Sequence, residues 1–238
     1  MQICRAFIIL VLSAIPLNVM ASEVGIVSYL SGTMIAIDSE GAQRLLAEKS
    51  VFSKGDVLTT LSSSHARIRF NDGTQLVLRP NTSLNIENVY FDEVTPQEDN
   101  FAIGLIKGGV RAVTGLIAKR NRDRVKFMSL TATVGIRGTH FGLQLCNQDC
   151  IDYKTISGGT LKDGLYADVA DGIISIANEV GEQEFQSGML AYVADSNTAP
   201  NITDESNGHR VTVPLSAMFD SNAQLWSEGV KCNACSVR

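Results

Sequence analysis

The sequence is poor in the residues and arrangements that common enzyme classes use for catalysis. It contains only three histidines, His65, His140 and His209, and no serine, histidine and aspartate in a context typical of a nucleophilic triad. Neither a paired-carboxylate motif nor a phosphate-binding loop occurs in a supporting context. His65 and His140 lie on the polar sides of expected strands, where an exposed position explains them. The sequence therefore predicts no catalytic residue, no cofactor and no enzyme activity.

Positive charge is also in short supply. The chain has 20 Lys and Arg against 25 Asp and Glu, a net charge of −5. Nucleic-acid-binding domains are typically basic, so this balance argues against a nucleic acid partner.

One segment, residues 119–126, is nevertheless strongly basic. Such a run can hold an acidic protein surface, an anionic polysaccharide or lipid headgroups. A solvated hairpin tip is the simpler alternative, with the acidic loop 92–100 lying against it. The candidate partner-binding residues are Arg120, Arg122, Arg124 and Lys126.

Long apolar runs are absent beyond the N-terminus. Arg5 precedes an apolar segment at residues 6–17, and the small residues around 19–21 are typical of a signal-peptide cleavage site. The segment is short for a transmembrane helix, although an uncleaved anchor is the alternative. No cysteine directly follows the expected cleavage site after Ala21, which argues against a lipoprotein. We expect a cleaved signal peptide at residues 1–21, a mature chain without a transmembrane segment, and a periplasmic location.

Cysteine is scarce too, and four of the five cysteines remain after the expected cleavage: Cys146, Cys150, Cys232 and Cys235. An exported chain meets an oxidising compartment, so two disulfides are expected. Local pairing within 146–150 and within 232–235 is the simplest of three connectivities, and cross-pairing would join the tail to the domain. A four-thiolate zinc site and a redox-active 232–235 motif are alternatives. The C-x3-C spacing, the exported location and the missing thioredoxin-like unit weaken them, so we predict structural disulfides and no metal.

What the sequence has in abundance is short alternating runs of β-forming residues between turn signals. Residues 65–70 alternate polar and apolar side chains, and Asp72-Gly73 then supplies a strong hairpin signal. Residues 41–49 are ambiguous between helix and strand, with Leu45 and Leu46 expected to point inward. Further strands are expected at residues 24–30, 33–37, 57–60, 74–79, 84–86, 101–106, 110–113, 165–169, 173–177 and 189–194, with a turn at 108–109.

The stretch from residue 130 to residue 143 reads as a strand, a tight glycine-rich turn and a second strand. Gly135 and Gly138 can adopt positive φ at little steric cost. Apolar Phe141, Leu143 and Leu145 alternate with small or polar residues, which predicts a half-buried strand. Together these patterns predict an all-β fold of many short strands, solenoid-like or sandwich-like.

The C-terminal part differs in composition. Residues 195–210 are polar and read as a linker, and Pro214 then opens an expected short helix that stops at Gly229. Its apolar stripe is expected to dock on the β domain rather than on a partner. We therefore divide the chain into a signal peptide (1–21), a β domain (22–195), and a tail (196–238) of linker, amphipathic helix and Cys-x-x-Cys motif.

The order of these features resembles the FecR family of periplasmic domains. Each motif alone is weak, but five in the right order form a specific pattern. They lie at residues 54–60, 66–78, 106–111, 131–141 and 171–176. The resemblance implies a twisted, all-β, solenoid-like domain that acts as a regulatory or protein-interaction module without catalysis.

The founding members of that family are inner-membrane proteins that relay the state of an iron–siderophore receptor to a cytoplasmic sigma factor. No sigma-binding segment, membrane span or receptor-docking domain of that kind is evident in this sequence, so the chain is more similar to stand-alone secreted FecR-domain proteins. The expected function is a non-enzymatic periplasmic interaction or signalling module that binds an envelope protein. The alternative is a structural protein that binds the cell wall or polysaccharide.

Overall fold

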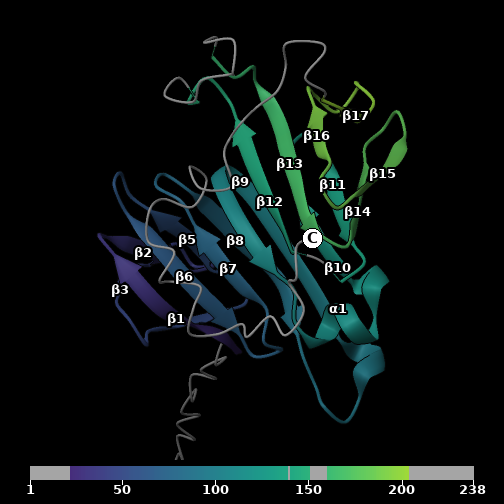
Figure 1. Cartoon of the computed structure of the whole chain (residues 1–238). Helices are drawn as coiled ribbons and strands as arrows, with labels where there is room; N and C mark the ends of the chain where they lie inside the picture. Colours follow the sequence, from purple (N-terminus) through teal and green to yellow (C-terminus); the bar gives the residue numbers. More distant parts are fainter. Residues whose placement is uncertain (1–21, 139, 151–159, 204–238) are drawn as a thin grey trace, which may run out of the picture.

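The computed structural model describes residues 22–138, 140–150 and 160–203. These residues form 17 strands, one short α-helix and two 3-10 segments, which confirms the all-β fold (Figure 1). The expected signal peptide, the expected C-terminal helix, and Cys232 and Cys235 lie outside the described residues.

All the described strands connect through hydrogen-bonded neighbours, and they fold into two layers. Layer A contains, in order, β4 (Val51–Ser53), β1 (Glu23–Ser31), β6 (His65–Phe70), β7 (Gln75–Leu78), the second half of β9 (Asn100–Val113), β12 (His140–Cys146), β13 (Gly164–Asp171), β16 (Leu190–Val193) and β17 (Asn201–Ile202).

Layer B contains β3 (Gln43–Leu46), β2 (Met34–Ile37), β5 (Val57–Thr60), β8 (Ser83–Tyr90), the first half of β9, β10 (Val125–Met128), β11 (Thr133–Ile136), β14 (Ile173–Ala177) and β15 (Glu182–Gln186). The chain passes repeatedly from one layer to the other, as in a solenoid. The result is both sandwich-like and solenoid-like, as the sequence predicts.

The long strand β9 joins the layers and corrects one expectation. The sequence suggests two strands separated by a turn at residues 108–109, but β9 runs without reversal from Asn100 to Val113. Gly108 has a φ of 79°, a conformation that costs glycine little. The strand therefore changes layer at this point, pairing with β8 and β10 before Gly108 and with β7 and β12 from Gly108 onward.

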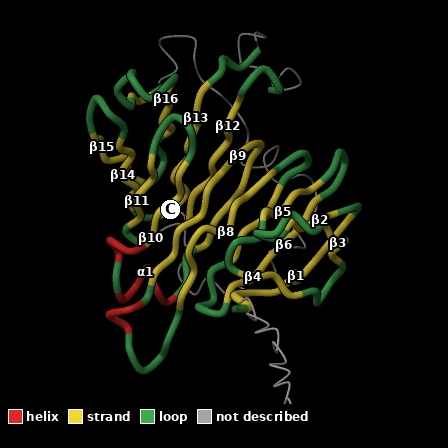
Figure 2. Tube along the Cα trace, turned by 180° about the vertical axis from the view of Figure 1, so that it is seen from behind, coloured by secondary structure: helices red, strands yellow, loops and turns green. Residues whose placement is uncertain are grey.

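The connection from β9 to β10 corrects a second expectation. These two strands are parallel, whereas the other pairs are antiparallel, and parallel neighbours need a crossover rather than a hairpin. Helix α1 (Leu116–Arg120) and the 3-10 segment η2 (Arg122–Arg124) make this crossover. The basic run is thus not a hairpin tip; together with η1 (Pro96–Glu98), its helical segments lie at one end of the sheet (Figure 2).

A chain of phenylalanine rings shows that the layers share one core. Ring centroids lie 5.2 Å apart for Phe52–Phe70, 4.8 Å for Phe70–Phe101, 5.8 Å for Phe101–Phe127 and 5.2 Å for Phe127–Phe141. The series starts in layer A, crosses to layer B on β9 and β10, and returns to layer A on β12. Burial of such large apolar rings is a main source of folding free energy.

Three local predictions, for residues 43–46, for the two glycines Gly135 and Gly138, and for the linker, are confirmed only in part. Residues 43–46 form a strand, and because successive strand residues face opposite sides, Leu46 is buried while Leu45 is 75 % exposed. The expectation that both point inward is therefore half wrong. Gly138 has a φ of 66°, but Gly135 lies inside β11 without a positive φ. At the other end, β17 pairs with β16, so the sheet extends into the segment that the sequence suggests is linker.

Candidate binding surfaces

The predicted basic residues do not form one surface. Arg120 turns back onto the acidic loop: its Nη1 atom lies 3.9 Å from Asp99 Oδ2 and donates to the Asp92 carbonyl at 3.4 Å. Its guanidinium also lies over the Phe91 ring, 5.3 Å from the centroid. The acidic loop thus lies against Arg120, as the alternative interpretation of the sequence holds, and Arg120 stabilises that loop.

Arg124 and Lys126, by contrast, line a groove of about 420 Å³ on the outer face of layer B. Lys126 on β10 pairs with Ala102 on β9, so the groove runs across central strands. Both cations are exposed, as is Arg122 beside them. The remaining lining residues are Asn88, Asn100, Ala102 and Asp123. The groove therefore presents positive charge and amide groups to solvent.

The outer face of layer A holds a second polar cluster that the sequence analysis does not identify. On β12, Gly142 pairs with Arg111 of β9 on one side and with Asp168 of β13 on the other. A Cβ atom on Gly142 would lie 2.2 Å from Asp168 Oδ1. Glycine is therefore needed here, because the Asp168 carboxylate occupies the space above it, on the side of Arg111. We call this set the Arg111–Gly142–Asp168 row.

A neighbouring row is built around Gln144. Arg79 Nη1 donates to Gln144 Oε1 at 3.0 Å, and Gln144 Nε2 donates to the Leu145 carbonyl at 3.2 Å and lies 3.6 Å from Cys150 Sγ. Gln144 and Gly142 are buried together with their inward-facing neighbours. The sequence predicts that only one side of β12 is buried. Phe141 on the inward side is buried as predicted, but Gly142 and Gln144 on the outward side are buried too.

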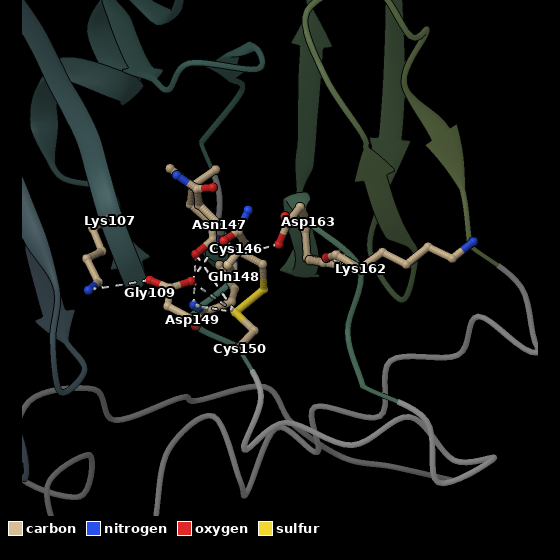
Figure 3. Close-up of a disulfide and its surroundings, with 12 residues drawn as sticks. Lys107, Gly109, Cys146, Asn147, Gln148, Asp149, Cys150, Lys162 and Asp163 are labelled. Carbon is tan, nitrogen blue, oxygen red and sulfur yellow. Dashed lines mark hydrogen bonds and ion pairs between the residues drawn. A yellow bond between two sulfur atoms is a disulfide. The ribbon is translucent and has the colours of Figure 1, made fainter.

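The Cys146–Cys150 disulfide lies at the end of this row (Figure 3), which confirms the local pairing predicted for these two cysteines. Its two cysteines form a small apolar cluster with Leu161 and Tyr166, separate from the main core. The loop is also held by Gln148, whose backbone N–H donates to Asp163 Oδ1 at 2.7 Å. Part of the outer face of layer A is therefore covered by the disulfide loop.

Burial governs the electrostatics of the layer A cluster. Desolvation lowers the pKa of Arg111, partly offset by the Asp168 charge. Desolvation and then the Arg111 charge lower the pKa of His140 to about 4, so His140 is neutral at pH 7. Desolvation raises the pKa of Asp168, and neither of its buried carboxylate oxygens has a hydrogen-bond donor. A guanidinium, a neutral imidazole that it contacts, and a poorly solvated carboxylate are thus close neighbours.

Within the described residues, no three His, Cys, Asp or Glu side chains gather in a way that could hold a metal ion. No helix in that part of the chain has the length and apolar character needed to cross a membrane.

Residues 56–158 match the model of the family described as FecR protein. This match confirms, over residues 56–158, the resemblance to the FecR family. The FecR match starts just before β5 and extends past the Cys146–Cys150 loop, so it includes β9, the basic crossover and β12.

Similar solved structures include two crystal structures, at 2.50 and 1.65 Å, of a candidate anti-sigma factor from Parabacteroides distasonis. Each is 11 % identical, with a TM-score of 0.45 over 62 % of this chain, which spans 59 % of the length of that protein. A cell surface anchoring domain is 24 % identical over 26 % of this chain and 82 % of its own, with a TM-score of 0.25. A comparison with curated proteins finds no match.

Proposed function

We propose that this FecR-domain protein is a non-enzymatic periplasmic module that binds an envelope protein and takes part in signalling. The observation that carries the proposal is the exposed, positively charged groove of layer B within a FecR domain. Arg124 and Lys126 stand on its rim at fixed spacing, because one ends the crossover and the other belongs to β10. A rigid sheet presents such cations to a partner at little entropic cost.

The chemistry of the groove favours an acidic protein surface as the partner. Its cations can form charge-assisted hydrogen bonds with carboxylates, while the amides of Asn88 and Asn100 can pair with a polypeptide backbone. Arg122 extends the positive surface beyond the groove. Charged rims of this kind accelerate and orient association rather than supply most of the affinity.

The second candidate, binding of an anionic polysaccharide, has one observation in its favour. The groove is lined by polar side chains of both amide and charged type, and these groups also recognise sugar hydroxyls and acids. The same groove could therefore bind either an acidic protein or an anionic polysaccharide. The two functions are distinguished by identifying the molecule that the protein binds in cells.

The test is cross-linking of the tagged full chain in intact cells, followed by identification of what co-purifies. The test variant carries Arg124→Ser and Lys126→Ser. The matched control carries Lys49→Ser and Lys54→Ser, which removes the same charge from exposed turns. Arg120 is left intact because its contact with Asp99 makes it a structural residue.

We expect one envelope protein to be captured by the wild type and by the control, and to be lost from the test variant. Recovery of wall or polysaccharide fragments with the same pattern would favour the second candidate. Equal capture by the test variant and the control would contradict a role for the layer B groove.

A further inference from the structure

Four strands of the described chain are paired on one side only, and they form the free edges of the two layers. Layer A ends at β4 and at β17, and layer B ends at β3 and at β15. The unpaired N–H and C=O groups of an edge strand are a template for another strand, so proteins usually shield their edges by short length or by charge. An edge that lacks both kinds of shield is a candidate for pairing with another chain.

Three of the four edges are shielded in one of these two ways. Strand β4 has three residues and β17 has two. Strand β15 has five residues, but its outward side carries Glu182 and Glu184, which are both exposed. Strand β3 lies at the margin of the molecule (Figures 1 and 2), and its exposed side chains are those of Gln43 and Leu45. It is therefore the one described edge that presents an exposed apolar side chain without an exposed charged one.

The single charged side chain of β3 is neutralised inside the molecule. Arg44 pairs with Ala36, which is buried, so Arg44 lies on the core side of the strand. Its Nη1 atom donates to Asp56 Oδ1 at 3.0 Å, and the Asp56 carboxylate is itself buried. The edge therefore offers a second strand its backbone and the Leu45 side chain, which is 75 % exposed.

We propose that two copies of this protein pair through their β3 edges, antiparallel and centred on Leu45, to form a two-fold symmetric dimer. Layer B is then continuous across both copies. The two-fold axis of such a pair stands at right angles to the sheet, so the outer faces of both B layers point to the same side. The dimer thus presents two copies of the Arg124 and Lys126 groove on one side. The inference stands without the proposed partner, because it concerns a contact between two copies.

The side chains of β3 select this register. Opposite residues of an antiparallel pair face the same side of the sheet, so a shift by one residue would place core-facing side chains opposite outward ones. Pairing centred on Arg44 would set two guanidinium groups opposite each other, and like charges in that position destabilise a sheet. Pairing centred on Leu45 sets the two exposed leucines together and places Arg44 opposite Leu46. This arrangement keeps the longest stretch of β3 paired without a clash of charge.

The turns on either side of β3 carry opposite charges that this register brings together. Residue 41 lies opposite residue 49 of the other copy, so the exposed Glu40 and Lys49 side chains become neighbours across the axis, once at each end. Glu48 is directed elsewhere, because its Oε1 atom accepts from the Leu30 backbone N–H at 3.4 Å. Such exposed pairs orient the two copies and add little affinity, so the dimer survives their loss. The short strand makes a small interface, which predicts a weak, concentration-dependent dimer.

The first test is sedimentation velocity of the full chain over a wide range of concentration. The test variant, Leu45→Lys, sets two like charges opposite each other at the axis. The matched control, Val94→Lys, adds the same charge in place of another apolar side chain that is 84 % exposed and lies outside β3. Circular dichroism verifies that both variants are folded.

We expect the wild type and the control to shift from monomer to dimer as the concentration rises. Leu45→Lys should weaken dimerisation by about tenfold, because it removes an apolar pair and opposes two charges. A monomer at every concentration would overturn the proposal and leave the β3 edge to a strand of another protein. Equal dimer affinities of the two lysine variants would also overturn it.

Disulfide trapping tests the register. Directly opposite Cα atoms in an antiparallel pair lie about 4.5–5.5 Å apart, which suits a disulfide, so Leu45→Cys should give a covalent dimer under mild oxidation. Gln43→Cys is the control, because it is an exposed outward position of the same strand whose two copies are about 13 Å apart along the strand in this register. Mass spectrometry locates the link between the two Cys side chains at position 45. Equal trapping at positions 43 and 45, or links through other cysteines only, would contradict the proposed pairing.

Discussion

The outer faces of the two layers carry similar side chains in opposite environments. On layer B, Arg124 and Lys126 are neighbours in the sequence and exposed in the structure. On layer A, Arg111 and Asp168 are 57 residues apart and meet only because β9, β12 and β13 are neighbours in register. The comparison teaches that a charge run in a sequence points to an exposed surface, whereas a buried polar cluster follows from strand register.

The largest difference between the faces should be in stability. Arg111→Ala removes the cation beside the buried Asp168 carboxylate, and we expect it to lower the free energy of unfolding by about 3 kcal/mol. Arg124→Ala, on the exposed face, should change it by less than about 0.5 kcal/mol. Urea denaturation of both variants measures the contrast. In an Asp168→Asn background, Arg111→Ala should cost less, because no buried carboxylate charge then remains; an unchanged cost would show that the two residues do not interact.

Removal of the disulfide should have the next largest effect. Cys146→Ser with Cys150→Ser opens a small loop, for which the loss of chain constraint predicts a destabilisation of about 2 kcal/mol. The measurement is the denaturation midpoint of the double variant in the absence of reductant. Because the cysteines pack with Leu161 and Tyr166 on layer A, proteolysis should also become faster near residues 146–161. Unchanged cleavage there would contradict a covering role for the loop.

Two glycines on the outward sides of central strands sharpen the contrast further. A Cβ on Gly142 would lie 2.2 Å from the buried Asp168 carboxylate, while a Cβ on Gly104 of layer B would lie 2.6 Å from the end of the exposed Glu87 side chain. We expect Gly142→Ala to cost about 1–2 kcal/mol through overpacking. Gly104→Ala should be nearly neutral, because Glu87 can move. Similar thermal midpoints for the two variants would contradict the difference in packing.

A pH dependence should also separate the two faces, and it is seen only when the solution is acidified. The pKa of His140 falls from its ordinary 6.5 to about 4 in the folded protein, so the unfolded chain binds more protons between these values. Stability from this residue is present above pH 6.5 and is lost as the pH falls toward 4. His140→Gln should therefore flatten the dependence of the denaturation midpoint on pH in that window. If the variant lost stability in acid as steeply as the wild type, His140 would not be the cause of the acid sensitivity.

Asp168 should act in the opposite direction. Burial raises its pKa, so the folded state holds its proton more tightly than the unfolded state does. Its contribution to stability is therefore greatest below the ordinary pKa of 3.8 and is lost as the pH rises through the raised value. Asp168→Asn should remove this loss at neutral pH, and the midpoint measured across the pH range gives the sign directly.

Much of the fold is predictable from local patterns. Alternation places Phe141 and Leu143 in the core, and the Asp72-Gly73 signal marks the β6–β7 connection. The sequence does not predict that β9 crosses layers, because a glycine with positive φ in a turn and one in a bend have the same local pattern. The hairpin expected at the basic run fails for a related reason: the parallel pairing of β9 and β10 is a property of the whole topology.

The candidate surfaces are predictable only in part. Arg122, Arg124 and Lys126 stand out as a charge run, and the structure leaves them exposed. Arg79 directly follows β7 and Arg111 lies in β9, and each is a single cation beside apolar residues. That single charge is the only signal of either residue in the sequence. Which other strand lies beside them depends on pairings between distant segments, which period-2 patterns do not specify.

The difference between the two faces can be tested most directly by arginine footprinting of the folded full chain with phenylglyoxal, read by mass spectrometry. The account predicts rapid modification of Arg122 and Arg124 and strong protection of Arg79 and Arg111, of which 8 % and 6 % are exposed. In denaturant all four should react at similar rates. Modification of Arg111 in the folded protein as fast as that of Arg124 would contradict the account.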